Sequence, residues 1–221
     1  MQVVSVFKKI ASYLFDLTLE KRKSDLSGEL TVSIHKGQYK LSTQDAIYSF
    51  GNEYTSFSTV FKALHIEKRT TEKVLILGFG LGSIVDLLRN NTSIKNITAL
   101  DADKVVIELA KKYLNPALQE KVEFRCTDAL YFTQNCIDAF DLVVFDVFIE
   151  DKTPVQFMQQ EFLFLLKNLV KHNGLLLYSK MEDSLHSKIE NYQFSKSFSS
   201  IFADAYTITT EGNRVYVWNN K

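Results

Sequence analysis

The sequence predicts an α/β fold: a Rossmann-like, seven-stranded, doubly wound sheet whose last strand is antiparallel, with a small N-terminal helix and β-hairpin. Two observations support this prediction. From residue 73 onward, short apolar runs alternate with segments of helical periodicity, a pattern typical of a mostly parallel sheet covered on both faces. Only residues 210–213 join the last two expected strands, and four residues are too few for a helical crossover, so the final strand must turn back on its predecessor.

The elements of this larger part follow from the periodicity of apolar residues. The strands are expected at residues 74–77, 97–100, 122–125, 142–145, 175–179, 205–209 and 214–218. The intervening helices are expected at residues 82–90, 104–113, 129–135, 155–170 and 184–202. Continuous apolar runs such as residues 74–77 and 142–145 are typical of strands buried on both faces.

The N-terminal part has a different pattern. Apolar residues recur at helical spacing over residues 3–17, and alternation on both sides of Lys36-Gly37 predicts a β-hairpin of residues 29–35 and 38–43. We therefore expect an N-terminal helix and hairpin extension over residues 1–65 and a cofactor-binding domain over residues 66–221. A homodimer formed through the N-terminal helix or hairpin is compatible with this pattern.

The composition excludes several classes of function. Lys plus Arg and Asp plus Glu are equal at 26 each, which argues against a nucleic-acid partner. No apolar run approaches the ~18 residues needed to cross a bilayer, and we expect no membrane partner. Two cysteines and four scattered histidines suggest no disulfide framework and no metal site. With no signal peptide expected, the sequence predicts a cytoplasmic protein.

The residues that follow the strands carry the binding chemistry, because ligands of open α/β sheets sit beyond the carboxyl ends of the strands. After the first strand comes Gly78-Phe79-Gly80-Leu81-Gly82, where glycine lets the backbone turn sharply and approach a ligand. We predict cofactor contacts for Gly78, Phe79, Gly80 and Gly82. After the second strand comes Asp101-Ala102-Asp103, in which Asp101 can accept the hydroxyl protons of a ribose and Asp103 can cap the next helix.

Two further carboxylates follow the next strands. Asp128, with Ala129, is placed either to meet the exocyclic amine of an adenine or to cap the helix that begins there, and the two roles are compatible. Asp146 ends an apolar strand where no turn or cap requires it, and burying a carboxylate has a cost unless a cationic or hydrogen-bonding group pairs with it. Asp146 is therefore the candidate for the reaction centre.

The glycines and Asp101 would suit either a dinucleotide or S-adenosylmethionine, so other residues must distinguish between these two ligands. A dinucleotide site requires the spacing Gly-x-Gly-x-x-Gly, and Ser83 occupies the last position. The acid after the third strand and the closing antiparallel hairpin also favour S-adenosylmethionine. Aromatic side chains are candidates to line the acceptor pocket, although such residues more often belong to the core; they are Tyr48, Tyr54, Phe148 and Tyr178.

The run from Val74 to Gly82, the turn at Leu100 to Asp103 and the segment from Phe140 to Asp146 resemble the spermidine-synthase-like branch of the class I S-adenosylmethionine-dependent methyltransferase superfamily. The N-terminal hairpin and the terminal strand, Gly212 to Trp218, fit the same branch. The resemblance covers residues 29–218 and implies the fold and a bound adenosyl group.

Three departures from the aminopropyltransferases bear on the reaction. Their glycine loop has an Asp for the amine of the decarboxylated donor where this chain has Leu81. Their Asp-Ser-Ser-Asp-Pro-like run is replaced after Asp146 by Val147-Phe148-Ile149, and their Gln-Gly-Glu by Ser179-Lys180-Met181. We therefore predict methyl transfer from S-adenosylmethionine to a small neutral or cationic acceptor, without a metal and with the decarboxylated donor less favoured. The alternatives are a polyamine aminopropyltransferase and a catalytically inert adenosyl-binding homologue.

Overall fold

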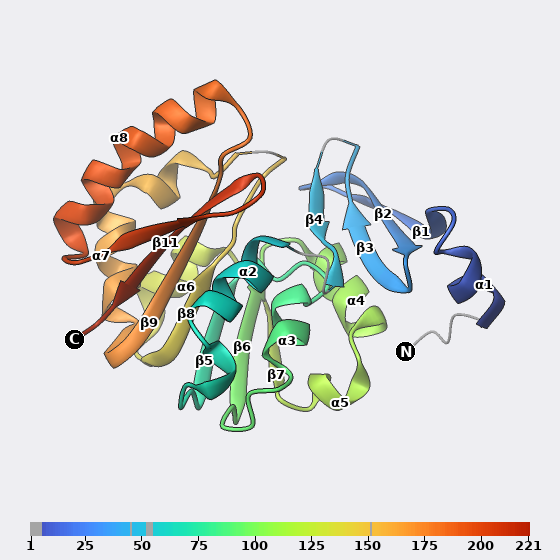
Figure 1. Ribbon diagram of the computed structural model, residues 1–221, viewed down its shortest axis with the longest axis horizontal. Helices are drawn as coiled ribbons and strands as arrows, with labels where there is room; N and C mark the ends of the chain where they lie inside the picture. The colour runs from blue at the N-terminus through green and yellow to red at the C-terminus, as the bar shows by residue number, and fades with distance from the viewer. Residues whose placement is uncertain (1–5, 45, 52–54, 151) are drawn as a thin grey trace.

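The computed structural model describes residues 6–44, 46–51, 55–150 and 152–221. Within them, a small antiparallel sheet lies beside a larger sheet that is covered by helices on both faces (Figure 1). The small sheet has the strand order β1-β2-β3-β4, and the large sheet has the order β10-β11-β9-β8-β5-β6-β7. No helix of the described residues is both long and apolar enough to cross a membrane.

In the N-terminal part, the helix is shorter than expected, whereas the hairpin turn lies where it was predicted. The helix ends early and a strand follows it, because residues 17–24 alternate between more and less exposed positions against β2. The predicted turn at Lys36-Gly37 is confirmed, with both residues at positive φ (48° and 75°), as a two-residue hairpin requires. The elements are α1 (Val6–Ala11), β1 (Leu17–Ser24), β2 (Gly28–His35), β3 (Gln38–Ser42) and β4 (Ile47–Ser49).

The large sheet confirms the predicted α/β class and topology. Its five parallel strands run in the order β9-β8-β5-β6-β7, and β11 pairs antiparallel with both β9 and β10. The antiparallel β10–β11 pair follows from the short connection over residues 210–212. The strands are β5 (Lys73–Leu77), β6 (Asn96–Asp101), β7 (Val122–Cys126), β8 (Phe140–Phe145), β9 (Val170–Met181), β10 (Tyr206–Thr209) and β11 (Asn213–Asn219).

Helices cover the two faces of this sheet in two separate cores. One core joins α2 and α3 to alternate residues of the strands, and the other joins α6, α7 and α8 to the residues between them. This arrangement explains the continuous apolar runs of residues 74–77 and 142–145 in the central strands. The helices are α2 (Thr55–Ala63), η2 (Ile66–Lys68), α3 (Ser83–Leu88), α4 (Lys104–Tyr113), α5 (Pro116–Gln119), α6 (Ala129–Asn135), η3 (Val155–Met158), α7 (Gln160–Asn168) and α8 (Leu185–Ile201).

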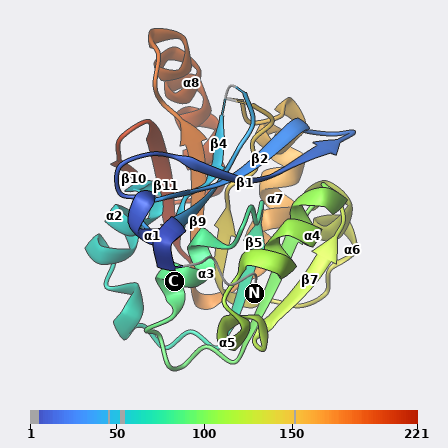
Figure 2. The same cartoon turned by 90° about the vertical axis from the view of Figure 1, so that its right-hand side faces the viewer.

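The small sheet is attached to the large part through α4, above which it lies in Figure 2. A third apolar cluster joins Leu30, Val32 and Leu41 of the small sheet to side chains of α4 and to Leu81. Polar contacts surround this cluster: Lys112 and the Tyr113 hydroxyl both contact Glu20, at 2.5 and 2.8 Å. The small sheet is therefore held by an apolar centre with a polar rim.

The division of the chain at residue 65 stays a prediction. Helix α2 precedes that residue, yet Phe57, Val60 and Phe61 pack in the same core as α3 and β11. On packing grounds we propose to place the boundary between β4 and α2, so that α2 belongs to the larger part.

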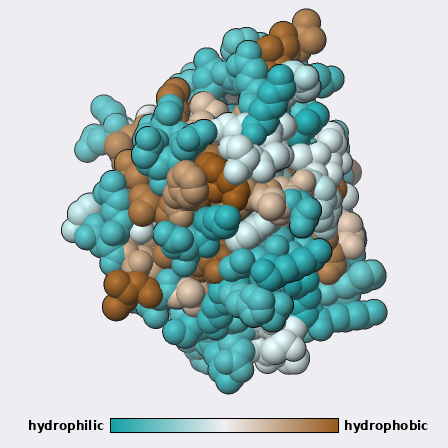
Figure 3. Space-filling view, turned by 90° about the vertical axis from the view of Figure 1, so that its left-hand side faces the viewer, coloured by the Kyte–Doolittle hydropathy of each residue, from teal (hydrophilic) through white to brown (hydrophobic). Residues whose placement is uncertain are grey.

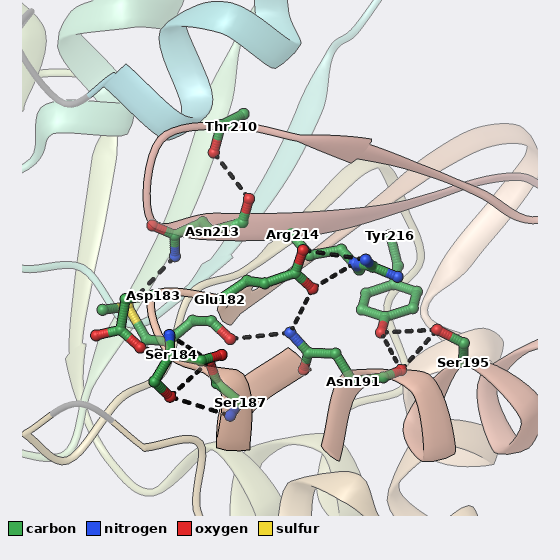
Figure 4. A network of polar contacts seen from close by, with 11 residues as sticks. Glu182, Asp183, Ser184, Ser187, Asn191, Ser195, Thr210, Asn213, Arg214 and Tyr216 are labelled. Carbon is green, nitrogen blue, oxygen red and sulfur yellow. Dashed lines mark hydrogen bonds and ion pairs between the residues drawn. The ribbon is translucent and has the colours of Figure 1, made fainter. Parts of the chain in front are cut away.

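A polar network joins the large sheet to α8 (Figure 4). Arg214 on β11 contacts Glu182, just after β9, at 2.6 Å, and Asn191 of α8 donates to the same carboxylate at 3.1 Å. The Tyr216 hydroxyl donates to the Asn191 carbonyl oxygen at 2.9 Å. The network thus joins the end of β9, the strand β11 and the first half of α8.

The Glu182–Arg214 pair gives a prediction about stability. The Glu182 side chain is 5% exposed and that of Arg214 is 27% exposed, so Arg214→Ala leaves a nearly buried carboxylate without its cation. We expect the free energy of unfolding to fall by about 3 kcal/mol, measured by urea denaturation. The control is Lys21→Ala, which removes an ion pair with Glu29 whose side chains are both more than half exposed, and should cost less than about 1 kcal/mol. Equal losses in the two variants would contradict the prediction.

Candidate functional site

A cavity of about 530 Å³ opens at the carboxyl ends of the parallel strands, between the two sheets. The loops after β5, β6, β7 and β8 form one side of it. The opposite sides come from the turn between β1 and β2, from β4, and from the turn between β10 and β11. The site is therefore built from segments that lie far apart in the sequence.

The glycine loop after β5 approaches two other backbone segments closely. Gly78 and Gly80 line the cavity at positive φ (86° and 55°). A Cβ on Gly78 would clash with the carbonyl oxygen of Asp146, and one on Gly80 would lie 2.9 Å from the Tyr48 carbonyl oxygen. Glycine is required here because loops from two sides leave no room for a side chain.

Two of the predicted cofactor residues do not line the cavity. The Phe79 side chain is buried in the core, where it meets Phe124 edge-on at 5.4 Å between ring centroids. Gly82 caps the N-terminus of α3 at φ 92°. Of the four predicted residues of the loop, Gly78 and Gly80 line the cavity, and their contacts with a cofactor stay a prediction.

Asp101 joins the glycine loop to the end of β6. Its Oδ2 accepts from the backbone N–H groups of Phe79 and Gly80 at 3.3 and 3.4 Å, and its Oδ1 accepts from that of Asp103 at 3.0 Å. Asp101 and Ala102 both line the cavity. Burial raises the pKa of Asp101 to about 6, against the lowering effect of these three N–H donors.

The predicted helix caps at Asp103 and Asp128 are confirmed. Asp103 accepts from the Val105 N–H at 2.8 Å and also from the Ser24 and Ser27 hydroxyls of the small sheet. Asp128 accepts from the first N–H groups of α6 through Oδ1, at 2.8 and 3.0 Å. Asp128 also lines the cavity with Ala129, so its cap leaves the carboxylate facing the site, and its contact with an adenine stays a prediction.

Asp146 lies in the cavity wall directly after β8, beside the glycine loop. Its N–H donates to the Leu77 carbonyl oxygen at 2.8 Å, which continues the β5–β8 pairing to the last residue before the loop. Beyond it, the Glu150 N–H donates to the Tyr48 hydroxyl at 3.3 Å, with Glu150 at φ 56°. This bond ties the loop after β8 to the small sheet across the cavity.

The four aromatic pocket candidates have different positions. Tyr48 and Phe148 line the cavity, and Tyr54 lies outside the described residues. The prediction for Tyr178 is wrong, because its ring is fully buried, stacks on Phe145 at 4.2 Å between centroids, and donates its hydroxyl to the Phe157 carbonyl oxygen. Tyr178 lies within β9, where alternate side chains point into the core instead of toward the strand end.

Sequence reasoning missed the walls that come from the turn between β1 and β2, from the segment after β9 and from the turn between β10 and β11. The last two add Asp183 and Glu211 to the acidic residues at the site, and a local motif could not have placed either one. Among the described residues that line the cavity, none is Lys, Arg or His. Seven lining residues are acidic: Asp101, Asp103, Asp128, Asp146, Glu150, Asp183 and Glu211. The site therefore has a negative field suited to cationic ligands.

The family of the spermine/spermidine synthase domain matches residues 58–212. The chain belongs to the spermine/spermidine synthase family. The matched region runs from α2 to the turn between β10 and β11, and so contains every strand-end loop of the cavity. The predicted resemblance to the spermidine-synthase-like branch is confirmed.

Curated relatives and solved structures agree with this family. The chain is 30% identical to spermine synthase SPE4 of Saccharomyces cerevisiae over 124 residues, which is 51% of this chain and 41% of that protein. It is 31% identical to a polyamine aminopropyltransferase of Sulfurisphaera tokodaii over 127 residues, 54% and 42% of the two chains. The aligned region thus spans less than half of each relative.

Two solved structures share the fold at low sequence identity. A spermidine synthase from Thermotoga maritima matches with TM-score 0.70 and 16% identity, over 93% of this chain and 73% of that one. Human methyltransferase-like protein 13, in complex with SAH, matches with TM-score 0.63 and 16% identity over 75% and 82% of the chains. At this identity, these likenesses concern the fold alone.

These comparisons overturn our prediction of the reaction. The matching family and the curated relatives are spermine synthases and polyamine aminopropyltransferases, so the preference for methyl transfer from intact S-adenosylmethionine is wrong. The structure supplies the physical reason. Leu81 is buried against Leu30 and Leu109 instead of facing the cavity, so the loss of an acid there is a feature of packing and does not report on the donor.

Asp101 predicts a pH dependence of stability. Its pKa rises from an ordinary 3.8 to about 6 on folding, so its stabilising contribution is present in full below pH 4 and is lost as the pH rises through 6. The Asp101→Asn variant has no carboxylate to ionise at this position, so it does not lose stability there as the pH rises. We expect the stability of the variant relative to the native chain to increase by about 2 kcal/mol between pH 4 and pH 7 in urea denaturation. Asp138→Asn, at an exposed pair with Lys73, is the control. A difference that does not change with pH would contradict the assignment.

Proposed function

We propose that this chain is an aminopropyltransferase, which moves the aminopropyl group of decarboxylated S-adenosylmethionine to the primary amine of a small acceptor. The observation that carries the proposal is the charge of the cavity: seven carboxylates line it and, among the described lining residues, no cationic side chain does. Decarboxylated donor and protonated amine acceptor are both cations, so both are attracted to this field. The family match supports the same reading.

The same field separates the two forms of the donor. The intact donor has a carboxylate that would have to lie among like charges in a site without a lining Lys, Arg or His. Two unit charges about 8 Å apart repel by about 2 kcal/mol at an effective dielectric of 20. Several such carboxylates therefore disfavour the intact donor, and the decarboxylated donor avoids this repulsion.

Each side of the cavity has a part in this reaction. The bare backbone at Gly78 and Gly80 lets the donor approach the loop, and we assign Asp101 to its ribose hydroxyls. We assign Asp128, with Ala129, to the exocyclic amine of the adenine. Asp101 and Asp128 are assigned to the donor in this scheme. We therefore assign Asp146, between the glycine loop and the loop after β8, to the nitrogen of the acceptor.

The chemistry requires no metal or nucleophilic side chain. The acceptor nitrogen attacks the methylene carbon bonded to the sulfonium, and the C–S bond breaks as the N–C bond forms. The bonding pair leaves on sulfur, which gives neutral methylthioadenosine. Because the acceptor arrives as an ammonium ion, it first releases one proton to solvent to expose the attacking lone pair, and the positive charge then appears on the product nitrogen. An ordinary carboxyl pKa of about 3.9 is about six units below that of an alkylamine. Asp146 therefore orients the amine and stabilises its developing positive charge.

One observation favours a second candidate, an adenosyl-binding homologue without turnover. The polar run after Asp146 and the Gln-Gly-Glu of the resembling enzymes are replaced by Val147-Phe148-Ile149 and by Ser179-Lys180-Met181. In this case the cavity would bind methylthioadenosine and the decarboxylated donor but form no product from any amine.

The choice of donor is tested by binding and by product. We expect decarboxylated S-adenosylmethionine to bind at least tenfold more tightly than the intact form in isothermal titration, because it lacks the repelled carboxylate. With a primary amine present, methylthioadenosine should accumulate, followed by chromatography. Tighter binding of the intact donor would contradict the proposal, and tight binding without product would favour the inert homologue.

The role of Asp146 is tested by Asp146→Asn, which keeps the size of the side chain and removes its charge. We expect kcat to fall by about a hundredfold, because a charge that stabilises the transition state is lost, while the affinity for methylthioadenosine changes by less than about threefold. Asp138→Asn, at an exposed carboxylate outside the cavity, should leave both values unchanged. Unchanged kcat in Asp146→Asn would exclude it from the reaction centre.

A further inference from the structure

Large aliphatic side chains gather at the mouth of the cavity. Leu26, Ile47 and Ile149 line it and are 63%, 55% and 57% exposed. They come from three separate segments: the turn between β1 and β2, the strand β4, and the loop after β8. Exposed apolar side chains scattered singly are ordinary on a protein surface, whereas a group that rims one cavity indicates a binding surface.

The apolar character continues inward to the proposed reaction centre. Val147 and Phe148 follow Asp146 directly and line the cavity with Ile149, where the resembling aminopropyltransferases have a polar and acidic run. An acceptor whose nitrogen lies at Asp146 therefore has its adjoining carbon atoms beside aliphatic and aromatic groups. The wall next to the reacting nitrogen is suited to a chain without further charges.

The loop that presents these side chains is held in place. Ile149 and Lys152 exchange two backbone hydrogen bonds, at 2.9 and 3.1 Å, which close a tight turn. The Glu150 N–H donates to the Tyr48 hydroxyl, so the turn is fixed against β4, which carries Ile47. Ile149 and Ile47 are thus set on two segments that this bond joins across the mouth.

Two shapes of acceptor must be compared. A diamine would use Asp183 and Glu211 for its second ammonium group, while an amine on an apolar body would use the rim of Leu26, Ile47 and Ile149. Both carboxylates are exposed, so water and salt screen their attraction for a second ammonium group more strongly than that of the half-buried Asp146 for the reacting one. Burial of an alkyl chain against three aliphatic side chains is not weakened in this way, and so it decides between the two shapes.

We propose that the acceptor carries its reacting amine on an apolar body, an alkyl or aryl chain in place of the second ammonium group of a diamine. The inference rests on the proposed function and narrows its acceptor. The ammonium end enters the acidic cavity toward Asp146, and the chain lies along the rim. The transfer is the one given above, with decarboxylated S-adenosylmethionine as the co-substrate and methylthioadenosine as the product.

The test measures kcat/KM for n-alkylamines from butylamine to octylamine, and for diamines of the same lengths, with decarboxylated S-adenosylmethionine. We expect kcat/KM to rise about threefold with each methylene group of the monoamines, which is the effect of burying a methylene. Octylamine should exceed 1,8-diaminooctane at least tenfold.

Ile149→Ser should lower kcat/KM for octylamine about fivefold and change that for butylamine by less than about twofold. The matched control is Ile189→Ser, at a 52% exposed isoleucine of α8 that does not line the cavity. Helix α8 lies on the face shown in Figure 3, where apolar and hydrophilic side chains are mixed.

Two results would overturn the inference. A monoamine series without a rise, or diamines preferred at every length, would refute the apolar acceptor and leave aminopropyl transfer intact, because product would still form. Absence of product with every amine would refute the proposed function as well, so the two failures are distinguishable.

Discussion

The carboxylate of Asp101 accepts three backbone N–H groups, from Phe79, Gly80 and Asp103, and the architecture of the site depends on this arrangement. Its two oxygens hold the loop after β5 against the turn after β6, which sets the direction in which α3 and α4 leave the sheet. The cost is the burial of a charge, which appears as a pKa raised to about 6 in spite of the three donors. The same loop also packs closely against the end of β8. Position 78 must therefore be glycine, since a side chain there would collide with the backbone of Asp146.

Features determined by neighbouring residues could be predicted from the sequence. The caps at Asp103 and Asp128 follow from a carboxylate placed directly before a helix, and the turn at Lys36-Gly37 from glycine in a hairpin. The large sheet follows from strands and helices in regular alternation, and the short connection between β10 and β11 gives its antiparallel end. In each case the deciding interaction lies within a few residues of the motif.

Features determined by tertiary packing could not be predicted in this way. In the sequence, Leu81 stands where the resembling enzymes have an acid, which suggests a lost binding residue. In the structure, the small sheet packs over Leu81 and makes it part of an apolar core. Tyr178 lies within β9, three residues before its end, and both faces of this strand are covered by helices, so its side chain belongs to the core and does not reach the cavity at the strand ends. Asp183 and Glu211 reach the cavity only because β9 and β11 are neighbours and antiparallel.

The attachment of the small sheet has a consequence for synthesis of the chain on the ribosome. Leu30, Val32 and Leu41 are complete early, but the side chains that cover them extend to Tyr113 at the end of α4. About 70 residues separate Leu41 from Tyr113, and at 5–20 residues per second this interval lasts about 4 to 14 seconds. During that time the apolar face of the small sheet lacks its partners on α4. Exposed apolar surface of this kind is prone to aggregation, so the small sheet is most vulnerable before α4 has been synthesised.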